Sequence, residues 1–327
     1  MNQFTSKKTL SKLPCVSIIV PNYNHSLFLI DRIESVLNQT YQNIQVILLD
    51  DRSSDHSREI LRSYAMHPKV SHLLENEYNS GNTFVQWGKG VSVAAGDLIW
   101  IAESDDWAEP NFLETLVPLL EVDGSLEAVF CRSKRIDSDG RDLGLWDDHL
   151  TRSTVDEFAV IKLTSSSLID FMVDGNCIPN ASSVLLRKRA FALLDPEIFT
   201  YRLNGDWIFW IKVIESGNIG YCPKPLNFFR HHNTNVRSRV EASGENLLEY
   251  LRVLGFMGDL RPGDKKILGK VASIVKDLHL RHARGALNSD VYKMALAEVA
   301  RMGVKGPGYQ MTLFKHQLRS IYNECFK

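Results

Sequence analysis

Acidic side chains are crowded into two short stretches of the sequence, Asp50–Asp51 and Glu103–Asp106. Each stretch directly follows an apolar run that is typical of a buried strand, residues 44–49 and residues 98–102. In an open parallel sheet, the carboxyl ends of the strands form the ligand-binding edge. Neighbouring carboxylates repel each other and cost free energy to desolvate unless a cation joins them. The pattern therefore predicts a site for Mn²⁺ or Mg²⁺ that binds together with a diphosphate.

The elements that must position these residues are legible in the first hundred residues. Four apolar runs predict strands, at residues 16–20, 44–49, 70–74 and 97–102. The segments between them carry apolar residues at helical spacing, and Pro21 is expected to end the first strand. This alternation predicts an α/β fold with an open, mostly parallel sheet flanked by helices.

The second half of the chain is less regular. Further strands are predicted at residues 128–135, 182–187 and 219–230, the last interrupted by Pro223 and Pro225. Helical patterns cover residues 189–194 and 206–217, and most of the chain after residue 240. We therefore expect an N-terminal extension at 1–13, an α/β domain at 14–240 and a C-terminal helical region at 241–327.

Composition excludes several classes of protein. The chain has 327 residues, a net charge of −1 and 24% charged residues, which gives no signature of nucleic-acid binding. Its five cysteines are scattered without a CxxC pair, which argues against a disulfide framework and a zinc knuckle. The polar residues 1–12 lack the apolar core of a signal peptide, and no run is long enough to span a bilayer. We expect a cytoplasmic protein.

Charge is unevenly distributed along the chain. Residues 261–327 contain 13 Lys and Arg against 5 Asp and Glu. A basic helical region can hold a protein at the inner face of a membrane, or it can pack on the main domain or on a second copy of the chain. The sequence leaves peripheral membrane association and homo-oligomerisation through these helices as open alternatives.

Several ordered motifs together resemble family 2 glycosyltransferases with the GT-A fold, over about residues 14–237. The motifs that carry the resemblance are VSIIVPNYN at 16–24, SVLNQTY at 35–41, LDDRSSD at 49–55, NSG at 79–81, AGD at 95–97 and AESDDW at 102–107. The resemblance implies an inverting, metal-dependent transferase of the hexosyltransferase type, of the kind that assembles bacterial polysaccharides. It implies a nucleotide-diphosphate sugar as donor, most commonly a UDP-sugar, and a glycan or lipid-linked acceptor.

The resemblance also implies roles for residues of the first half. Asp51 would accept hydrogen bonds from the base, and the other residues expected along the nucleotide are Pro21, Asn22, Tyr23, Asn79 and Asn82. Glu103, Asp105 and Asp106 correspond to the metal and ribose motif, with Asp106 expected to bind the metal directly and Asp105 beside it. Two positions depart from the family pattern, because Arg52 stands where Gly is frequent and Glu103 where Asp is usual.

Four further roles are implied in the second half. Asp206, just before an aromatic helical run, corresponds to the general base that takes the proton from the acceptor hydroxyl; the alternative is a helix N-cap. His232 is expected near the metal or diphosphate, and Arg230 is expected to pair with phosphate. Asn180 is a candidate contact for the donor sugar.

Other functions were weighed against this one. The glycines at 88–96 are wrongly spaced and placed for a dinucleotide fingerprint, and GxxxxGK[ST] and GxSxG motifs are absent from the sequence. A sugar nucleotidyltransferase would require a basic loop after the first strand, where this chain has Pro-Asn-Tyr-Asn. A non-catalytic sugar-binding or scaffold protein with the same fold is the remaining alternative, and the intact acidic residues argue against it.

Overall fold

The computed structural model describes residues 13–146, 161–178, 180–231 and 245–302. Strands and helices alternate in the first hundred residues, as the sequence predicts. They are β1 (Val16–Asn22), α1 (Ser26–Leu37), β2 (Ile44–Asp50), α2 (Ser57–Tyr64), β3 (Val70–Glu75), α3 (Thr83–Ser92) and β4 (Leu98–Ile101).

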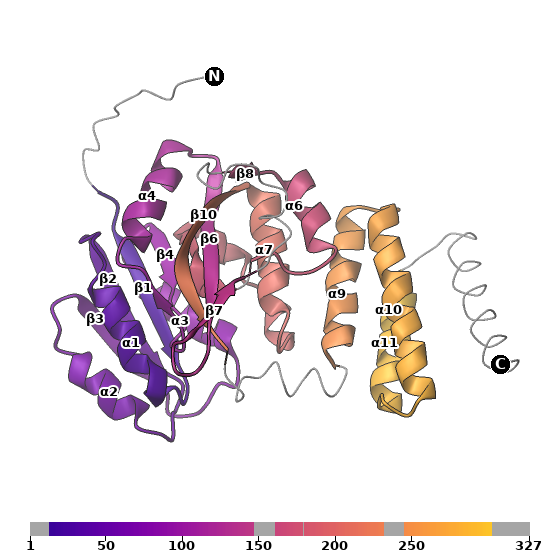
Figure 1. The fold of residues 1–327 in the computed structure, drawn as a ribbon, viewed down its shortest axis with the longest axis horizontal. Helices are drawn as coiled ribbons and strands as arrows, with labels where there is room; N and C mark the ends of the chain where they lie inside the picture. The colour runs from indigo at the N-terminus through magenta and orange to yellow at the C-terminus, as the bar shows by residue number, and fades with distance from the viewer. Residues whose placement is uncertain (1–12, 147–160, 179, 232–244, 303–327) are drawn as a thin grey trace, which may run out of the picture.

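The second half adds strands, helices and short 3₁₀ turns (Figure 1). Its strands are β5 (Trp107–Ala108), β6 (Leu126–Ile136), β7 (Asp142–Leu145), β8 (Ile161–Leu163), β9 (Val184–Arg187) and β10 (Asn218–Arg230). Its helices are α4 (Phe112–Val122), α6 (Ser165–Met172), α7 (Gly205–Ser216), α9 (Glu245–Leu260), α10 (Lys265–Ala283) and α11 (Ser289–Arg301). The helix predicted at 189–194 is a 3₁₀ turn, Lys188–Leu193, and the helical pattern at 313–321 lies outside the described residues.

The strands form one mixed sheet. Its order is β3-β2-β1-β4-β9-β6-β10-β5, with β7 beside β6 and β8 beside β10. The first four strands are parallel, as predicted, and β6 runs parallel to β10. β9 lies antiparallel between β4 and β6, so it joins the parallel first half to the second half. β10 is continuous through Pro223 and Pro225, and it absorbs these residues by shifts in its register against β6.

Pro21 lies inside β1, which continues to Asn22, so the expected end of the strand at this proline was wrong. Asp51 donates its backbone N–H to the carbonyl of Asn22, so even-numbered residues of β1 face β2. Ala102 donates to the carbonyl of Ile19, so odd-numbered residues face β4. Pro21 has an odd number, so an N–H at this position would point toward β4. Because β4 ends at Ile101, the proline costs the sheet no hydrogen bond.

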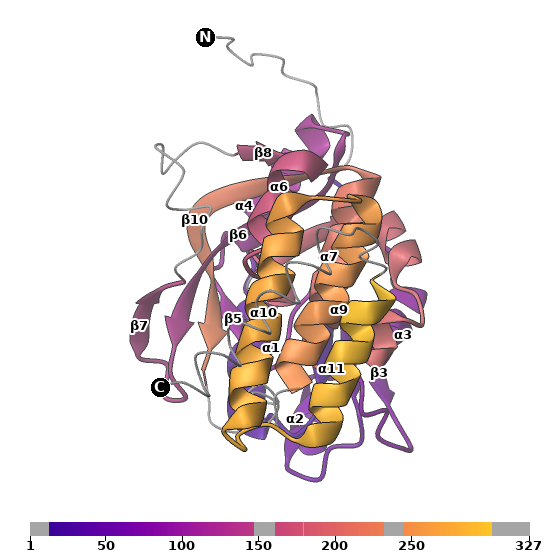
Figure 2. The ribbon, with the colours of Figure 1, turned by 90° about the vertical axis from the view of Figure 1, so that its right-hand side faces the viewer.

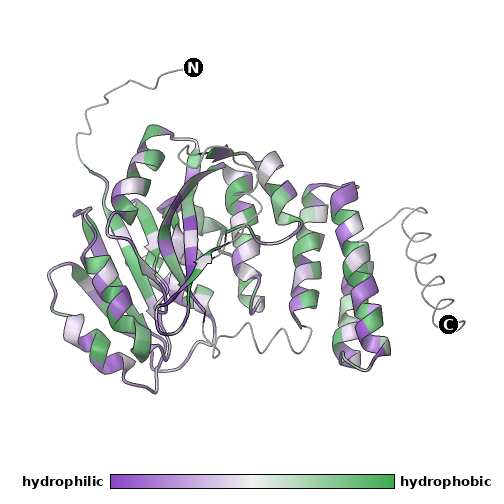
Figure 3. Ribbon diagram, in the orientation of Figure 1, coloured by the Kyte–Doolittle hydropathy of each residue, from purple (hydrophilic) through white to green (hydrophobic). Residues whose placement is uncertain are grey.

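Two hydrophobic cores lie on opposite faces of the sheet. One packs α1, α2 and α4 against residues such as Ile18 and Trp100, and the other packs α3, α6 and α7 against residues such as Ile19 and Phe130. The central strands are almost wholly apolar, and most surrounding helices are apolar on one side only, whereas α7 is apolar on almost every side (Figure 3). This is the pattern expected when a sheet is covered on both faces.

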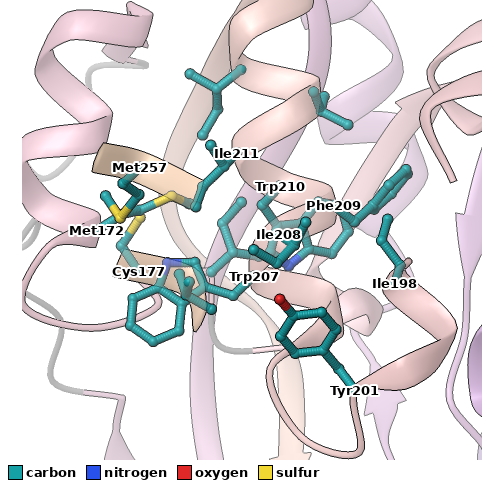
Figure 4. Packing of buried hydrophobic residues seen from close by; sticks show 14 of the residues in the cluster. Met172, Cys177, Ile198, Tyr201, Trp207, Ile208, Phe209, Trp210, Ile211 and Met257 are labelled. Atoms are coloured by element: carbon teal, nitrogen blue, oxygen red, sulfur yellow. The ribbon is translucent and has the colours of Figure 1, made fainter. Parts of the chain in front are cut away.

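The C-terminal helices extend the second core and do not form one of their own. Met257 of α9 is fully buried beside Met172 of α6 and Cys177 (Figure 4). Leu251 and Leu254 of α9 belong to the same cluster, and α10 and α11 pack on α9 on the side away from the sheet (Figure 2). Within the described residues the expected boundary near residue 240 is not a boundary between cores. No helix of the described chain is long and apolar enough to cross a membrane.

A pair of methionine substitutions tests whether α9 is part of this core. We expect Met257→Ala to lower the free energy of unfolding by about 2–5 kcal/mol, because it leaves a cavity between α9 and α6. Met294→Ala on α11, where the side chain is 46% exposed, is the matched control and should change it by less than about 0.5 kcal/mol. Urea denaturation followed by tryptophan fluorescence measures both. If the C-terminal helices unfolded in a separate transition, and Met257→Ala shifted only that transition, the shared core would be contradicted.

Candidate functional site

A cavity of about 500 Å³ opens where β1, β2 and β4 end. Residues at the ends of these strands or shortly after them form one side of it, namely Pro21, Asn22, Tyr23, Asp51 and Glu103. The start of α3, with Asn79 and Asn82 just before it, forms a second side. The loop before α7 completes the cavity with Tyr201 and Arg202. The structure therefore brings seven of the residues expected at the nucleotide into one cavity.

Asp51 lines this cavity with a buried carboxylate that already has several partners. It accepts hydrogen bonds from Asn76 Nδ2 (2.6 Å), the backbone N–H of Ser80 (2.8 Å), Ser80 Oγ (2.8 Å) and Gln86 Nε2 (3.0 Å). Asn79 donates to the backbone carbonyl of Asp51 (2.8 Å). The first structural consequence of Asp51 is therefore to hold residues 76–82 against the end of β2.

Asn22 lies behind Asp51 and has one polar atom without a partner. Its Nδ2 donates to Asp50 Oδ2 and Ser53 Oγ, both at 3.1 Å. Its Oδ1 is buried and has no hydrogen-bond partner within the described part of the chain. Because an unsatisfied buried acceptor costs about 1–3 kcal/mol, this atom is a ready acceptor for a ligand donor.

Arg52 keeps the backbone conformation for which glycine is favoured. Its φ is 62°, in the left-handed region, and Asn24 across the loop has a φ of 56°. The Arg52 guanidinium donates to the carbonyl of Glu77 and lies 6.0 Å from the centroid of the Tyr78 ring. The turn after Asp51 is therefore retained despite the larger residue, at a cost of about 1–2 kcal/mol in backbone strain.

Glu103 is held at the cavity by groups from two neighbouring elements. Trp87 Nε1 of α3 donates to its carboxylate (2.9 Å), and its backbone N–H donates to Ser182 Oγ (3.1 Å). Burial, together with the negative charges of Asp105 and Asp106, raises the pKa of Glu103 to about 8. A cation bound at this loop would oppose that shift, because it stabilises the ionised carboxylates.

Asp106 is turned into the protein, although it was expected to bind the metal directly. Only 1% of it is exposed, and its carboxylate accepts hydrogen bonds from Asn180 Nδ2 and from the backbone N–H of Arg230 (2.9 Å). Arg32 Nη2 lies 3.9 Å from Asp106 Oδ2. Burial and the charge of Asp105 raise the pKa of Asp106. Asp105 is half-buried, and it is the better placed of the two to reach a bound cation.

Arg230 and Asn180 support the acidic loop from behind and do not line the cavity. Arg230 Nε donates to the carbonyl of Asp105 (2.8 Å), and Nη1 donates to the carbonyls of Asp137 and Ser138. Asn180 Oδ1 accepts from Asn227 while its Nδ2 donates to Asp106. In this geometry Arg230 contacts both Asp105 and Asp106, and Asn180 contacts Asp106; the phosphate contact of Arg230 and the sugar contact of Asn180 stay predictions. His232 lies outside the described residues.

Asp206 lies in the first turn of α7, one residue inside the helix. The N-cap position is Asn204, so the alternative that Asp206 is the N-cap was wrong. The carboxylate of Asp206 accepts hydrogen bonds from its neighbour's backbone N–H at Trp207 (2.8 Å) and from Asn176 Nδ2 (3.1 Å). A Cβ on Gly205 would lie 2.5 Å from Phe84 Cε2, so α7 starts in close contact with a residue of the cavity wall.

Several cavity residues escaped the sequence analysis. His25 lines the cavity, and its Nδ1 is 2.8 Å from Oγ of Ser104, the residue between Glu103 and Asp105. Tyr201 and Arg202 come from a loop that the sequence marks only by its place before Asp206. The position of His25, directly after the polar loop that follows the first strand, was the one signal that could have identified it.

The residues at the acidic loop suit a metal that is bound jointly with its ligand. Among the described residues, no three His, Cys, Asp or Glu side chains converge into a group that could hold a cation alone. Mg²⁺ and Mn²⁺ usually take one or two protein carboxylates and complete their coordination with substrate phosphates and water. Glu103 and Asp105 supply hard oxygen donors of that kind, and Glu103 lines the cavity.

Comparison with known proteins agrees with this fold. Residues 17–172 match the sequence profile "Glycosyl transferase family 2". S. aureus TarS 1–349, solved in complex with UDP-GlcNAc, superposes with a TM-score of 0.59 at 15% identity, covering 86% of this chain and 87% of that one. Residues 17–172, nearly half of the chain, therefore resemble family 2 glycosyltransferases, and the chain shares the GT-A fold of TarS.

Sequence relatives match over different extents. Glycosyltransferase GlyG of Streptococcus pneumoniae is 42% identical over 101 residues, which are 31% of this chain and 33% of that protein. The Escherichia coli chondroitin synthase is 34% identical over 133 residues, 40% of this chain and 19% of the synthase. An uncharacterized glycosyltransferase of Haemophilus influenzae is 23% identical over 300 residues and is covered to 88%. The chain thus spans a third or less of the first two relatives and most of the third.

The two neighbouring aspartates should respond differently to removal. We expect Asp106→Ala to lower the free energy of unfolding by about 3–5 kcal/mol, because it leaves the buried Arg32 without its ionic partner. Asp105→Ala is the matched control and should cost less than about 1 kcal/mol, since it removes a charge that repels Glu103 and Asp106. Urea denaturation in metal-free buffer compares them. If both substitutions lowered the free energy of unfolding equally, Asp106 would not differ from Asp105 in supporting the loop.

Proposed function

We propose that this chain is an inverting, metal-dependent glycosyltransferase that transfers a sugar from a nucleotide-diphosphate donor to an acceptor hydroxyl. The observation that carries the proposal is the cavity itself, which is bounded by the acidic loop after β4 and by the loop that leads into Asp206. A site for a leaving diphosphate and a carboxylate for proton removal are the two parts that such a reaction requires.

The donor would lie with its nucleotide against β1 and β2. Pro21, Asn22 and Tyr23 form the floor at this end, and Asn79 and Asn82 face them from the start of α3. The unsatisfied Oδ1 of Asn22 and the carboxylate of Asp51 are acceptors for N–H groups of a base. We favour a UDP-sugar, because TarS, which shares the fold, has been solved with UDP and with UDP-GlcNAc.

Asp105 and Glu103 would hold the Mn²⁺ or Mg²⁺, with His232 as a further candidate ligand and Asp106 fixing the loop beneath. The bound cation supplies positive charge beside the diphosphate as it leaves. Arg32 Nε donates to the carbonyl of Glu103 (2.8 Å) and Arg230 Nε to that of Asp105, so the loop is held in place before the donor binds. Such preorganisation is the main protein contribution to stabilising developing charge.

Asp206 would act as the general base. Its carboxylate is oriented by Asn176 and by the backbone N–H of Trp207 in the first turn of α7. When Asp206 takes the proton of the acceptor hydroxyl, the oxygen attacks the anomeric carbon from the face opposite the diphosphate. The bond to the diphosphate then breaks, and the configuration at that carbon inverts.

The acceptor would be a glycan or a lipid-linked sugar in cell-surface polysaccharide assembly. This part of the proposal is supported by the chondroitin synthase of Escherichia coli among the relatives. The described part of the C-terminal region packs on the main domain, and its helices carry exposed basic residues such as Lys276 of α10 and Lys293 of α11. Membrane contact or self-association through this surface would be additional to that packing.

Nucleotide binding provides the first test. We expect UDP with Mn²⁺ to stabilise the protein by about 2.7 kcal/mol at a ligand concentration near 100 times Kd, and EDTA to remove most of that gain. Thermal shift with UDP, GDP, ADP and dTDP measures the effect and ranks the bases. Asp105→Ala should lose the Mn²⁺ dependence, while Asp139→Ala, on the exposed turn after β6, should keep it. Stabilisation by UDP that is indifferent to EDTA would contradict the proposed metal site.

Substitution of the general base provides the second test. Asp206→Asn should lower kcat for transfer by about 10²–10⁴-fold, because the amide cannot take a proton. Affinity for UDP should remain within about threefold of the unmodified protein, since Asp206 does not line the nucleotide end of the cavity. Asp195→Asn, an exposed carboxylate paired with Lys212 of α7, is the control and should retain full kcat. Full activity of Asp206→Asn would assign the base elsewhere.

A further inference from the structure

We propose that Glu249 of the C-terminal helix α9 is a positioning residue of the active site, which holds the loop 201–204 in the shape required for donor binding and for proton removal by Asp206. This inference rests on the proposed function and adds a residue outside the segment that matches the family profile, residues 17–172. It makes α9 part of the catalytic apparatus.

The Glu249 carboxylate is bound by three consecutive backbone N–H groups. Arg202 N donates to Oε1 (2.7 Å), and Leu203 N and Asn204 N donate to Oε2 (3.0 and 2.9 Å). Glu249 is only 5% exposed, so these bonds lie in a region of low dielectric. Hydrogen bonds to an ionised acceptor are about twice as strong as neutral ones, and successive N–H groups around one anion form a recognised binding geometry.

The loop bound by Glu249 serves the cavity at one end and α7 at the other. Tyr201 and Arg202 line the cavity together with residues at the start of α3, Thr83 and Phe84. Asn204 is the N-cap position of α7 but makes no side-chain capping bond, so the helix start is not fixed by the usual device. Asp206 follows two residues later. The positions of the cavity wall and of Asp206 therefore both depend on the contacts that hold residues 202–204.

Two other contacts hold this loop from the opposite side. Asn82 Nδ2 donates to the carbonyl of Phe199 (2.8 Å), and Gly205 is in close contact with the ring of Phe84. The loop is thus clamped between the start of α3, which faces the nucleotide, and Glu249 of α9. The clamp on the α3 side alone cannot satisfy the N–H groups of residues 202–204. A buried N–H without a partner costs about 1–3 kcal/mol, so loss of Glu249 favours a rearranged loop.

A purely structural residue and a positioning residue differ in what their substitution changes. If Glu249 only attached α9 to the domain, its loss would lower stability and leave the folded protein with unchanged kinetics. If it positions the loop, the folded protein itself must show weaker donor binding and slower chemistry. Kinetic constants corrected for the folded fraction therefore separate the two roles.

The test is Glu249→Gln, compared with Tyr250→Phe on the same helix. Gln keeps the size of the side chain but replaces one acceptor oxygen by an N–H₂ group that opposes the backbone donors. We expect a fall in kcat/KM of about 10- to 100-fold, shared between a higher KM for the donor and a lower kcat. Tyr250→Phe removes a hydrogen bond from α9 to the carbonyl of Val173 (2.8 Å), which does not involve the loop, and should change kcat/KM less than threefold. A destabilised Glu249→Gln protein with unchanged kcat and KM would overturn the proposal.

Hydrogen exchange of the unmodified chain keeps the proposal falsifiable if Glu249→Gln does not fold. The amides of Arg202, Leu203 and Asn204 should exchange slowly in the free protein, and UDP with Mn²⁺ should slow them further. Exchange at the rate of an unstructured peptide, or no response to the nucleotide in a protein that binds it, would overturn the positioning role. Absence of both nucleotide binding and transfer in the unmodified protein would instead count against the proposed function, while slow exchange would still show that Glu249 holds the loop.

Discussion

The site depends on a buried arrangement of opposite charges beneath the loop that follows β4. The carboxylate of Asp106 meets Arg32, and Arg32 Nε binds the carbonyl of Glu103. Arg230 contributes its backbone N–H to Asp106 and its Nε to the carbonyl of Asp105. Each residue of the loop is therefore fixed either through its side chain or through its backbone, and the two arginines are themselves almost completely buried.

Burying these charged groups costs free energy, but it fixes the geometry of the loop after β4. Burial lowers the pKa of Arg32 to about 10 in spite of Asp106 beside it, and the same burial raises the pKa of Glu103. Replacing buried ion pairs by apolar groups is frequently neutral or stabilising, so stability alone does not account for them. Here Arg32 comes from α1 and Arg230 from the end of β10, so the pairs tie the loop to elements on both halves of the sheet. The result is a fixed loop that presents Glu103 to the cavity.

The sequence predicts most of the secondary structure in the first half of this protein. Each of the strands β1 to β4 is an apolar run that is followed by polar residues. The sequence also places Asp51 and Glu103 correctly at one edge. The sequence could not predict that Asp106 is buried while Asp105 is only half-buried. The two side chains are identical, and only the direction of the backbone at each position determines where they point. The partners of Asp106 lie 74 and 124 residues away, and no local pattern encodes them. Glu249 was missed for the same reason, because an acidic residue on an amphipathic helix is ordinarily solvated.

The order of strands in the sheet has a consequence for how the protein is made. Strands β1 to β4 pair with one another and can form as soon as the first hundred residues have left the ribosome. The acidic loop cannot assume its final shape then, because the strand that ends in Arg230 pairs with β5 and β6 only after more than a hundred further residues have been synthesised. The nascent chain thus carries a preformed half-sheet whose ligand edge is still unassembled. The ability to bind a ligand therefore arises late in biosynthesis, when β9, β6 and β10 have joined the sheet beside β4.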